Sequence, residues 1–293
     1  MVYLKRNRMR FYTTLVSTLL CALTAPLGLA SLSEAGTLGA TLPTPDSFLK
    51  RLENSVRSLH SYAVTHSQIE RFGNQLGPKM KMRSKHCHGR TYLKMLEGPK
   101  KDAEVIYVPG WNHGKVKVHK GSFPDLTLSL DPHGSLMMDD QHHPIEHGGL
   151  DYVVGTLVKT TRACRNFPGS TLRILNPQTL ELVAPWKEKM EQVLKDESIW
   201  SFATRLSSDP FLILQTNHIK DWDDVEQGMK LKIPTCYAGR TLLTVDPVNH
   251  LPRKLTTFDW KGQLYEEYEW QDLDRTTLIS DADFDPKNRA YGF

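Results

Sequence analysis

Apolar and polar residues alternate with a period of two along two parts of this 293-residue chain. Alternation of this kind is typical of β-strands that have one buried and one solvated face and that pair antiparallel. Asn112-His113-Gly114 supplies a turn between two of these runs. The predicted strands are 79–83, 104–108, 115–119, 127–130, 242–245, 253–258 and 263–270. The last three are separated by short turns and predict a C-terminal meander.

Two stretches have helical spacing instead. The first begins at Asp46, predicted as the N-cap after Pro45, and its apolar face consists of Phe48, Leu49, Leu52, Val56 and Leu59. The second has Pro144 in its first turn and carries Ile145, Leu150, Val153, Val154, Leu157 and Val158. These patterns predict an α+β fold, in which helices lie against the concave face of a curved antiparallel sheet.

The first thirty residues differ from the rest of the chain. A basic head of Lys5, Arg6, Arg8 and Arg10 precedes an uncharged stretch from residue 11 to residue 33, and Gly28-Leu29-Ala30 offers small residues to a signal peptidase. This order predicts a cleavable signal peptide over 1–30 and a periplasmic protein. The alternative is a membrane anchor, but Thr, Ser, Pro and Gly dilute the apolar stretch that a membrane span needs.

Removal of this signal changes the charge balance. The whole chain has 37 Lys and Arg against 33 Asp and Glu, and the four basic residues of the head leave 33 against 33. A neutral mature chain of mixed charge argues against a nucleic-acid partner. That chain keeps Cys87, Cys164 and Cys236, so an oxidising compartment allows one disulfide and one free thiol, with the pairing left open.

The most specific pattern of the sequence lies in 190–234. Ser198 caps one predicted helix, Asp209-Pro210 starts a second helix that Asn217 ends, and a loop leads to a strand that stops at Pro234. This order resembles a LysM module, a small βααβ unit that binds glycans containing N-acetylglucosamine, such as peptidoglycan. The sequence departs from the LysM pattern at Asp196-Glu197, where such modules usually carry Gly-Asp.

The LysM resemblance implies a sugar groove between two loops, and with it a peptidoglycan partner. The residues that it implies for this groove are Asp196, Glu197, Ser198, Ile199, Asn217, His218, Ile219 and Trp222. The alternative is a unit of the same fold that has lost sugar binding and only braces the sheet.

A second set of short motifs is spread over the rest of the chain. It comprises Tyr107-Val108-Pro109-Gly110, Leu130-Asp131-Pro132, His143-Pro144-Ile145, Leu251-Pro252-Arg253, Asp272-Leu273, Asp281–Phe284 and Tyr291-Gly292-Phe293. These motifs resemble a periplasmic family of unknown function related to the LolA-like lipoprotein carriers. The resemblance implies a half-barrel of antiparallel strands, whose concave apolar side receives acyl chains in LolA-like proteins.

The two resemblances together give an organisation for the whole chain. It runs from the signal peptide (1–30) and a linker (31–45) through the first part of the half-barrel (46–189), a LysM-like insert (190–234) and a C-terminal meander (235–293). Strand alternation predicts an apolar ligand lining formed by Met80, Met82, Val105, Tyr107, Val116, Val118, Leu128 and Leu130. The alternative is that the two helices fill the concavity completely.

Two groups of histidines are candidates for metal chemistry. They are His86 and His88 beside Cys87, and His133, His142, His143 and His147. His143 and His147 would share one helix face at a metal-compatible spacing, but neither group contains HExxH. We therefore expect solvated surface histidines, with no metal site, no cofactor and no catalytic residue.

The function predicted from these patterns is that of a non-catalytic periplasmic binding protein. Its partner would be an apolar envelope ligand, either a lipid or a lipoprotein acyl chain, with peptidoglycan association and no transmembrane span in the mature chain. Two alternatives stay open, a metal-dependent periplasmic hydrolase that uses the histidines and a purely structural wall-associated protein.

Overall fold

The computed structural model of the protein describes residues 42–293. The predicted signal peptide and most of the predicted linker lie outside the described residues. Between residues 42 and 293, no helix has the length and apolar character needed to cross a bilayer.

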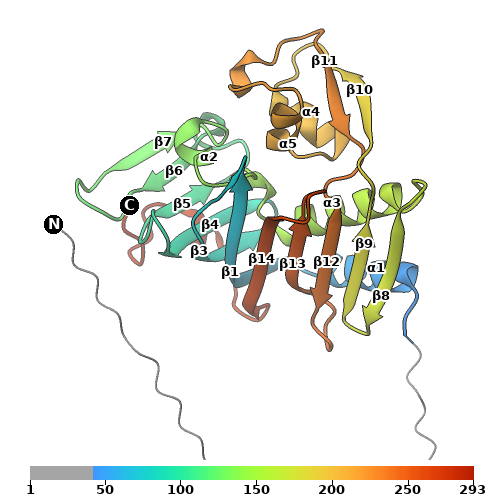
Figure 1. Ribbon diagram of the computed structural model, residues 1–293. Coiled ribbons are helices and arrows are strands. Elements are labelled where there is room, and N and C mark those ends of the chain that lie inside the picture. The colour runs from blue at the N-terminus through green and yellow to red at the C-terminus, as the bar shows by residue number, and fades with distance from the viewer. Residues whose placement is uncertain (1–41) are drawn as a thin grey trace, which may run out of the picture. The chain divides into compact units, whose positions relative to one another are not determined.

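A twelve-stranded antiparallel sheet forms the body of the molecule (Figure 1). Its N-terminal strands are β1 (Ser61–Phe72), β2 (Gln75–Leu76), β3 (Met80–Cys87), β4 (Arg90–Glu97), β5 (Glu104–Tyr107), β6 (Val116–His119) and β7 (Thr127–Leu130). Its C-terminal strands are β8 (Thr171–Asn176), β9 (Thr179–Val183), β12 (Arg240–Val245), β13 (Pro252–Phe258) and β14 (Leu264–Asp274). The order is β7-β6-β5-β4-β3-β1-β14-β13-β12-β9-β8, so the sheet is not closed into a barrel.

The first and last long strands, β1 and β14, pair at the centre of this sheet. They join the N-terminal hairpins to the C-terminal meander, and their register places Glu70 opposite Glu266. The short helical segment η1 (Asn112–Gly114) turns the chain between β5 and β6, where the sequence predicts a turn. The predicted fold class is confirmed.

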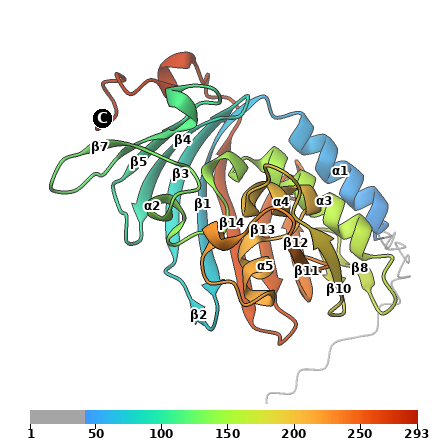
Figure 2. The same ribbon diagram turned by 90° about the horizontal axis from the view of Figure 1, so that it is seen from above.

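Helices α1 (Pro45–Arg57) and α3 (Leu150–Cys164) lie across one face of the sheet (Figure 2). Both bury their apolar sides in the main core, α1 through Leu49 and Leu52 and α3 through residues such as Val154. The N-cap of α1 is Thr44, whose hydroxyl accepts a hydrogen bond from the Ser47 N–H. The predicted cap at Asp46 is wrong, because Pro45 already occupies the first helical position and Asp46 falls in the first turn.

The helix predicted from Pro144 also begins later than expected. A short 3₁₀ turn, η2 (Ile145–His147), follows the small helix α2 (Ser135–Met138), and α3 starts only at Leu150. Gly148 and Gly149 separate the two elements, and Gly149 takes an extended conformation as the N-cap of α3. The predicted i, i+4 helix face of His143 and His147 is therefore wrong.

Residues 188–234 form a second, smaller unit between β9 and β12. Strand β10 (Glu188–Gln192) is followed by α4 (Ile199–Leu206), α5 (Pro210–Thr216), η3 (Trp222–Asp224) and β11 (Lys230–Pro234). The two strands pair antiparallel with each other and not with the main sheet. Ser198 caps α4 and Asp209 caps α5, and the unit has its own core around Phe202 and Ile213.

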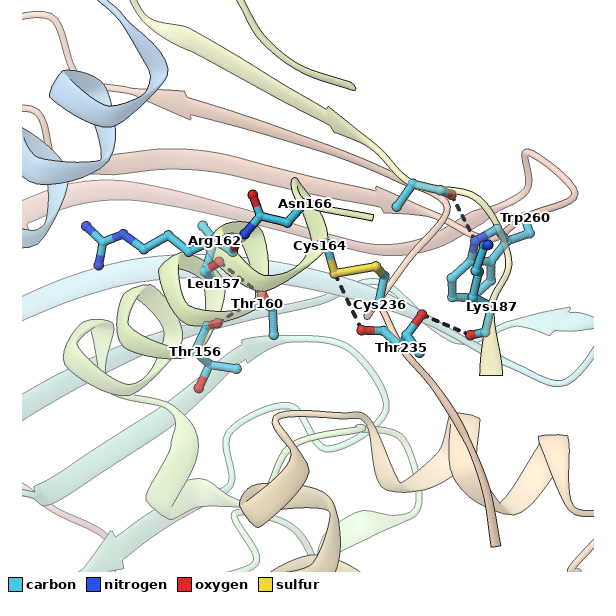
Figure 3. The surroundings of a disulfide bond; sticks show 11 residues. Thr156, Leu157, Thr160, Arg162, Cys164, Asn166, Lys187, Thr235, Cys236 and Trp260 are labelled. Atoms are coloured by element: carbon cyan, nitrogen blue, oxygen red, sulfur yellow. Dashed lines mark hydrogen bonds between the residues drawn. A yellow bond between two sulfur atoms is a disulfide. The ribbon is translucent and has the colours of Figure 1, made fainter. Parts of the chain in front are cut away.

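A disulfide between Cys164 and Cys236 ties the end of α3 to the segment that leaves this unit (Figure 3). Their Cα atoms are 5.7 Å apart and the bond closes a sequence separation of 72 residues. Cys87 is the buried free thiol. The sequence allowed one disulfide and one thiol, and the structure supplies the pairing.

We expect loss of this disulfide to destabilise the protein by about 2–4 kcal/mol, because the open loop gains conformational freedom in the unfolded state. Urea unfolding of the double variant Cys164→Ser/Cys236→Ser measures this loss. Cys87→Ala is the control, since it removes a sulfur without opening a loop. Equal stability of the double variant and the wild type would contradict the prediction.

Candidate functional site

A cavity of about 210 Å³ lies between the sheet and helices α2 and α3. Its apolar lining consists of Met80, Met82, Leu93, Met95, Val105, Val118, Leu130, Leu136, Met137, Ile145, Val153, Leu157 and Leu255. Four of these residues are methionines, whose unbranched side chains adapt to differently shaped contacts. The lining therefore suits an apolar guest.

The position of the cavity follows from how the helices cover the sheet. The core beneath α1 and α3 is continuous with β1 and the C-terminal strands, through residues such as Leu180, Leu243 and Trp270. Met80, Met82 and Met95 instead form a separate small cluster on β3 and β4, with Ala103. The cavity borders this cluster and also extends under α3, where Leu255 and Trp270 line it.

The predicted ligand lining is only partly brought together at this cavity. Met80, Met82, Val105, Val118 and Leu130 line it. Val116 is fully buried in a neighbouring cluster with Tyr107 at its edge. Leu128 is 40% exposed because β7 is an edge strand of the sheet.

Polar residues line part of the cavity as well, chiefly from β1. His66, Gln68 and Glu70 alternate along β1 and face the cavity. Burial lowers the pKa of His66 to about 3 and that of His86, on the neighbouring strand, to about 4. Both imidazoles are therefore neutral near pH 7, which keeps this part of the wall uncharged.

A buried polar cluster adjoins the cavity where the 188–234 unit meets the sheet. Four separate segments bring it together: His142 and His143 from the loop after α2, Asp209 at the N-cap of α5, Tyr237 after β11, and Glu266 on β14. His143, Tyr237 and Glu266 also line the cavity. The cluster thus contacts both the pocket and the small unit.

His142 is the centre of this cluster and is completely buried. Its Nδ1 lies 2.8 Å from Oε1 of Glu266 and 3.3 Å from Oδ2 of Asp209. Its Nε2 lies 3.0 Å from the Arg71 carbonyl, and its backbone N–H donates to the Glu70 carboxylate. The expectation that the histidines are solvated is wrong for His142 and also for His86, which is buried.

The charges in this cluster shift one another's pKa values. Burial disfavours the imidazolium form of His142, but the carboxylates of Asp209, Glu70 and Glu266 outweigh it and raise the pKa to about 10. Burial likewise disfavours the Glu266 carboxylate, yet hydrogen bonds from His142 and His143 lower its pKa to about 2. The cluster therefore holds ionised groups inside the protein.

Burial also raises the pKa of two other members of the cluster. Burial raises the pKa of Glu70, which accepts a hydrogen bond from the Tyr268 hydroxyl. Burial, with the nearby Glu266 and Asp209 carboxylates, also raises the pKa of Tyr237 well above its usual range. Tyr237 is accordingly a neutral hydroxyl donor, 2.7 Å from Glu266 and 3.3 Å from Asp209.

The predicted glycan residues lie in two loops of the 188–234 unit. Asp196, Ser198 and His218 are exposed, whereas Glu197, Asn217, Ile219 and Trp222 are partly buried. The ring centroids of Trp222 and Trp200 are 5.8 Å apart, so the second loop lies beside the start of α4. Ile199 is buried in the core of the unit, because it is the first residue of α4 and faces inward.

Several of these residues also have clear structural contacts. The Asn217 side chain donates to the Ile213 and Lys232 carbonyls and accepts from the Lys232 N–H, which ties α5 to β11. Glu197 forms a charge-assisted hydrogen bond with Arg205. Asp196 in the first loop and His218 in the second are both exposed, and the backbone of each is in the left-handed region.

The sequence alone did not reveal the polar cluster, although two inward-facing carboxylates hinted at it. Along β1, Glu70 lies on the same face as His66 and Gln68, which line the cavity. Along β14, Glu266 lies on the same face as Tyr268 and Trp270. A carboxylate at the inward positions of a strand is rare unless it has a buried partner. The partners themselves come from distant segments and could not be paired from the sequence.

Comparisons with known proteins give a family and several similar structures. The family model described as "Protein of unknown function (DUF1571)" matches residues 59–202 and 216–293. Curated proteins show no significant match.

Three of the solved structures to which the chain is similar are the following. A DUF1329 family protein from Desulfovibrio piger is 11% identical, with a TM-score of 0.38, over 84% of this chain and 98% of that chain. A LolA superfamily protein from Nitrosomonas europaea is 10% identical, with a TM-score of 0.30, and the match covers 83% of this chain and 98% of that chain. The lipoprotein LppX from Mycobacterium tuberculosis is 7% identical, with a TM-score of 0.35, and the match covers 80% of this chain and 98% of that chain.

We expect Glu266→Ala to destabilise the fold by about 3–5 kcal/mol, because it leaves buried histidines without their carboxylate partner. The neighbouring substitution Glu267→Ala is the matched control. Glu267 pairs with the partly exposed Lys254, and such pairs contribute less than about 1 kcal/mol. Urea unfolding of both variants makes the comparison, and equal losses would show that the cluster adds no stability.

Proposed function

The chain belongs to the DUF1571 family, and we propose that it is a non-catalytic binding protein for an apolar ligand of the bacterial envelope. The ligand is a lipid or the acyl chain of a lipoprotein, held between the sheet and α3. The observation that carries this proposal is the cavity itself, with its four methionines and its neutral histidines.

The chemistry of the cavity supports an acyl ligand over a polar one. Transfer of apolar surface out of water contributes ~25 cal/mol per Å², so an acyl segment gains affinity from any of the aliphatic side chains it covers. Polar groups also line the cavity, among them the cluster of His143, Tyr237 and Glu266. An amphipathic molecule would place its chain over the methionines and its polar end near this cluster.

The proposal includes export to the periplasm through a signal over 1–30. The disulfide between Cys164 and Cys236 supports an oxidising compartment, since such bonds are rare in reducing ones. The neutral balance of the remaining chain gives no attraction for nucleic acid.

We expect a fluorescent fatty-acyl probe to bind the delipidated protein saturably. Met82→Glu should abolish binding because it places a charge in the apolar lining, and Val153→Phe should weaken it by narrowing the cavity from α3 without adding charge. Titration followed by fluorescence measures both effects.

Leu128→Glu is the matched control for this experiment. It puts the same charge on a nearby strand, but at an exposed position that does not line the cavity. Binding that is lost equally in Met82→Glu and Leu128→Glu would place the probe elsewhere, and no binding to the folded wild type would make the sheet a filled scaffold.

A second part of the proposal concerns the 188–234 unit, which we propose to be LysM-like and to associate with peptidoglycan. Its βααβ order and the closeness of the second loop to the start of α4 support a groove between the two loops. The exposed side chains of Asp196 and His218 stand one in each loop. The bracing role stays the alternative.

We expect the protein to co-sediment with purified peptidoglycan and to be displaced by chitin oligomers. Asp196→Gly/His218→Gly should reduce sedimentation, because it removes both side chains where glycine suits the left-handed backbone. Met190→Thr, on the exposed side of β10, is the control. Sedimentation that disappears in modest salt would indicate nonspecific charge attraction, since exposed charges are screened within ~10 Å at 0.1 M.

A further inference from the structure

We propose that His142, Asp209 and Glu266 bind one divalent first-row transition-metal ion. His143 and Tyr237 complete the ligand set. The site would lie where the loop after α2, the small unit and strand β14 converge, beside the cavity.

The first support is the convergence of donor atoms. One ligand atom from each of His142, Asp209 and Glu266 lies within 4.8 Å of the other two. Nε2 of His143 is 3.3 Å from Oε1 of Glu266 and 3.0 Å from the Tyr237 hydroxyl. Metal–ligand bonds of about 2.1 Å place neighbouring donor atoms about 3.0–3.5 Å apart. This range contains these two distances and the 3.3 Å between His142 and Asp209, whereas the 2.8 Å between His142 and Glu266 would lengthen.

The second support is the orientation of His142. Its Nε2 lies 3.0 Å from the Arg71 carbonyl, which can only accept, so Nε2 carries a proton. A metal ion would replace the proton on Nδ1, and the imidazole would then present a lone pair toward Glu266 and Asp209. A hydrogen bond from the other ring nitrogen to a backbone carbonyl is the usual way in which a protein orients a metal-binding histidine.

The Asp209 carboxylate is oriented in a similar way, and the backbone of Glu266 is fixed. Oδ1 of Asp209 accepts the Leu212 N–H at the start of α5, which leaves Oδ2 directed at His142. The Glu266 N–H donates to the Thr257 hydroxyl, which fixes the backbone of β14 at this point. Each of the three central ligands is therefore held by a contact outside the cluster.

The third support is the balance of donors and acceptors. The Tyr237 hydroxyl lies within 3.3 Å of Glu266, Asp209 and His143, and its one proton can serve only one of the two carboxylates. Over residues 42–293, no Lys or Arg forms an ion pair with Glu70, Asp209 or Glu266. Lone pairs that converge in a buried place need a cation between them. A proton on His142 satisfies only part of this set, whereas a metal ion satisfies all of it.

The donor types indicate the class of metal. Imidazole nitrogen suits Zn²⁺, Fe²⁺ and similar ions, whereas Ca²⁺ and Mg²⁺ prefer sites made of oxygen alone. The side chain of His143 is 31% exposed, so an ion can enter from the cavity side. We use Zn²⁺ and Co²⁺ as probes.

The test is a titration of chelator-treated protein with Zn²⁺, followed by calorimetry, and a parallel titration with Co²⁺, followed by visible absorption. We expect one equivalent to bind, a rise in Tm with Zn²⁺, and d–d bands with Co²⁺. Glu266→Gln and His143→Gln, which keep the side-chain size, should weaken Zn²⁺ binding more than about 100-fold, since even supporting residues around a metal contribute 10–100-fold.

His133→Gln is the matched control. His133 and Glu146 form another histidine–carboxylate pair, 2.8 Å apart, but without converging ligands. Circular dichroism of each variant shows whether it is folded. If Glu266→Gln does not fold, His143→Gln still tests the proposal. No Zn²⁺ or Co²⁺ binding by the folded wild type would overturn the proposal, as would binding that Glu266→Gln and His143→Gln leave intact or that His133→Gln removes.

Discussion

The pairing of β1 with β14 is the contact on which the rest of the structure depends. It joins strands that are about two hundred residues apart in the sequence, and it makes one sheet out of the N-terminal hairpins and the C-terminal meander. The same register places Glu70 and Glu266 side by side on the inward face. Two adjacent buried carboxylates are unfavourable alone, so the fold requires a partner for them, and His142 fills that role.

This requirement also positions the small unit and the cavity. Asp209 of the small unit reaches His142, and Phe211 packs against both His142 and Phe72. The disulfide from Cys236 to α3 holds the following segment, so Tyr237 stays over Glu266. The unit is thereby fixed beside the concavity, while the cavity lies between α3 and the sheet and borders the methionines of β3 and β4.

Local patterns could predict much of this fold. The strand 127–130 was predicted with its observed bounds. Four of the five residues predicted for the apolar face of α1 are buried in it, because period and burial agree along one element, whereas Leu59 lies beyond its end. Alternation identified Met80 and Met82 as cavity residues, since they lie on a central strand. It placed Leu128 there too, because a sequence pattern does not show that β7 is an edge.

The polar cluster could not be predicted in the same way. Its ligands come from residues 142 to 266, and only the β1–β14 pairing and the packing of the small unit bring them together. His142 and His143 were expected to be solvated because they lie in a turn-rich stretch of the sequence. Their partner Glu266 lies in a run of charged residues, where one buried carboxylate is not distinguished from its neighbours.

The central claim is that the space over β3 and β4 is a binding site and not a packing defect. Extraction of the protein purified gently from its native envelope, followed by lipid mass spectrometry, tests it most directly. The account predicts a co-purified amphipathic lipid or acylated peptide in near-stoichiometric amount, lost from Met82→Glu and kept by Leu128→Glu. Folded protein that carries no apolar molecule in any preparation would contradict it.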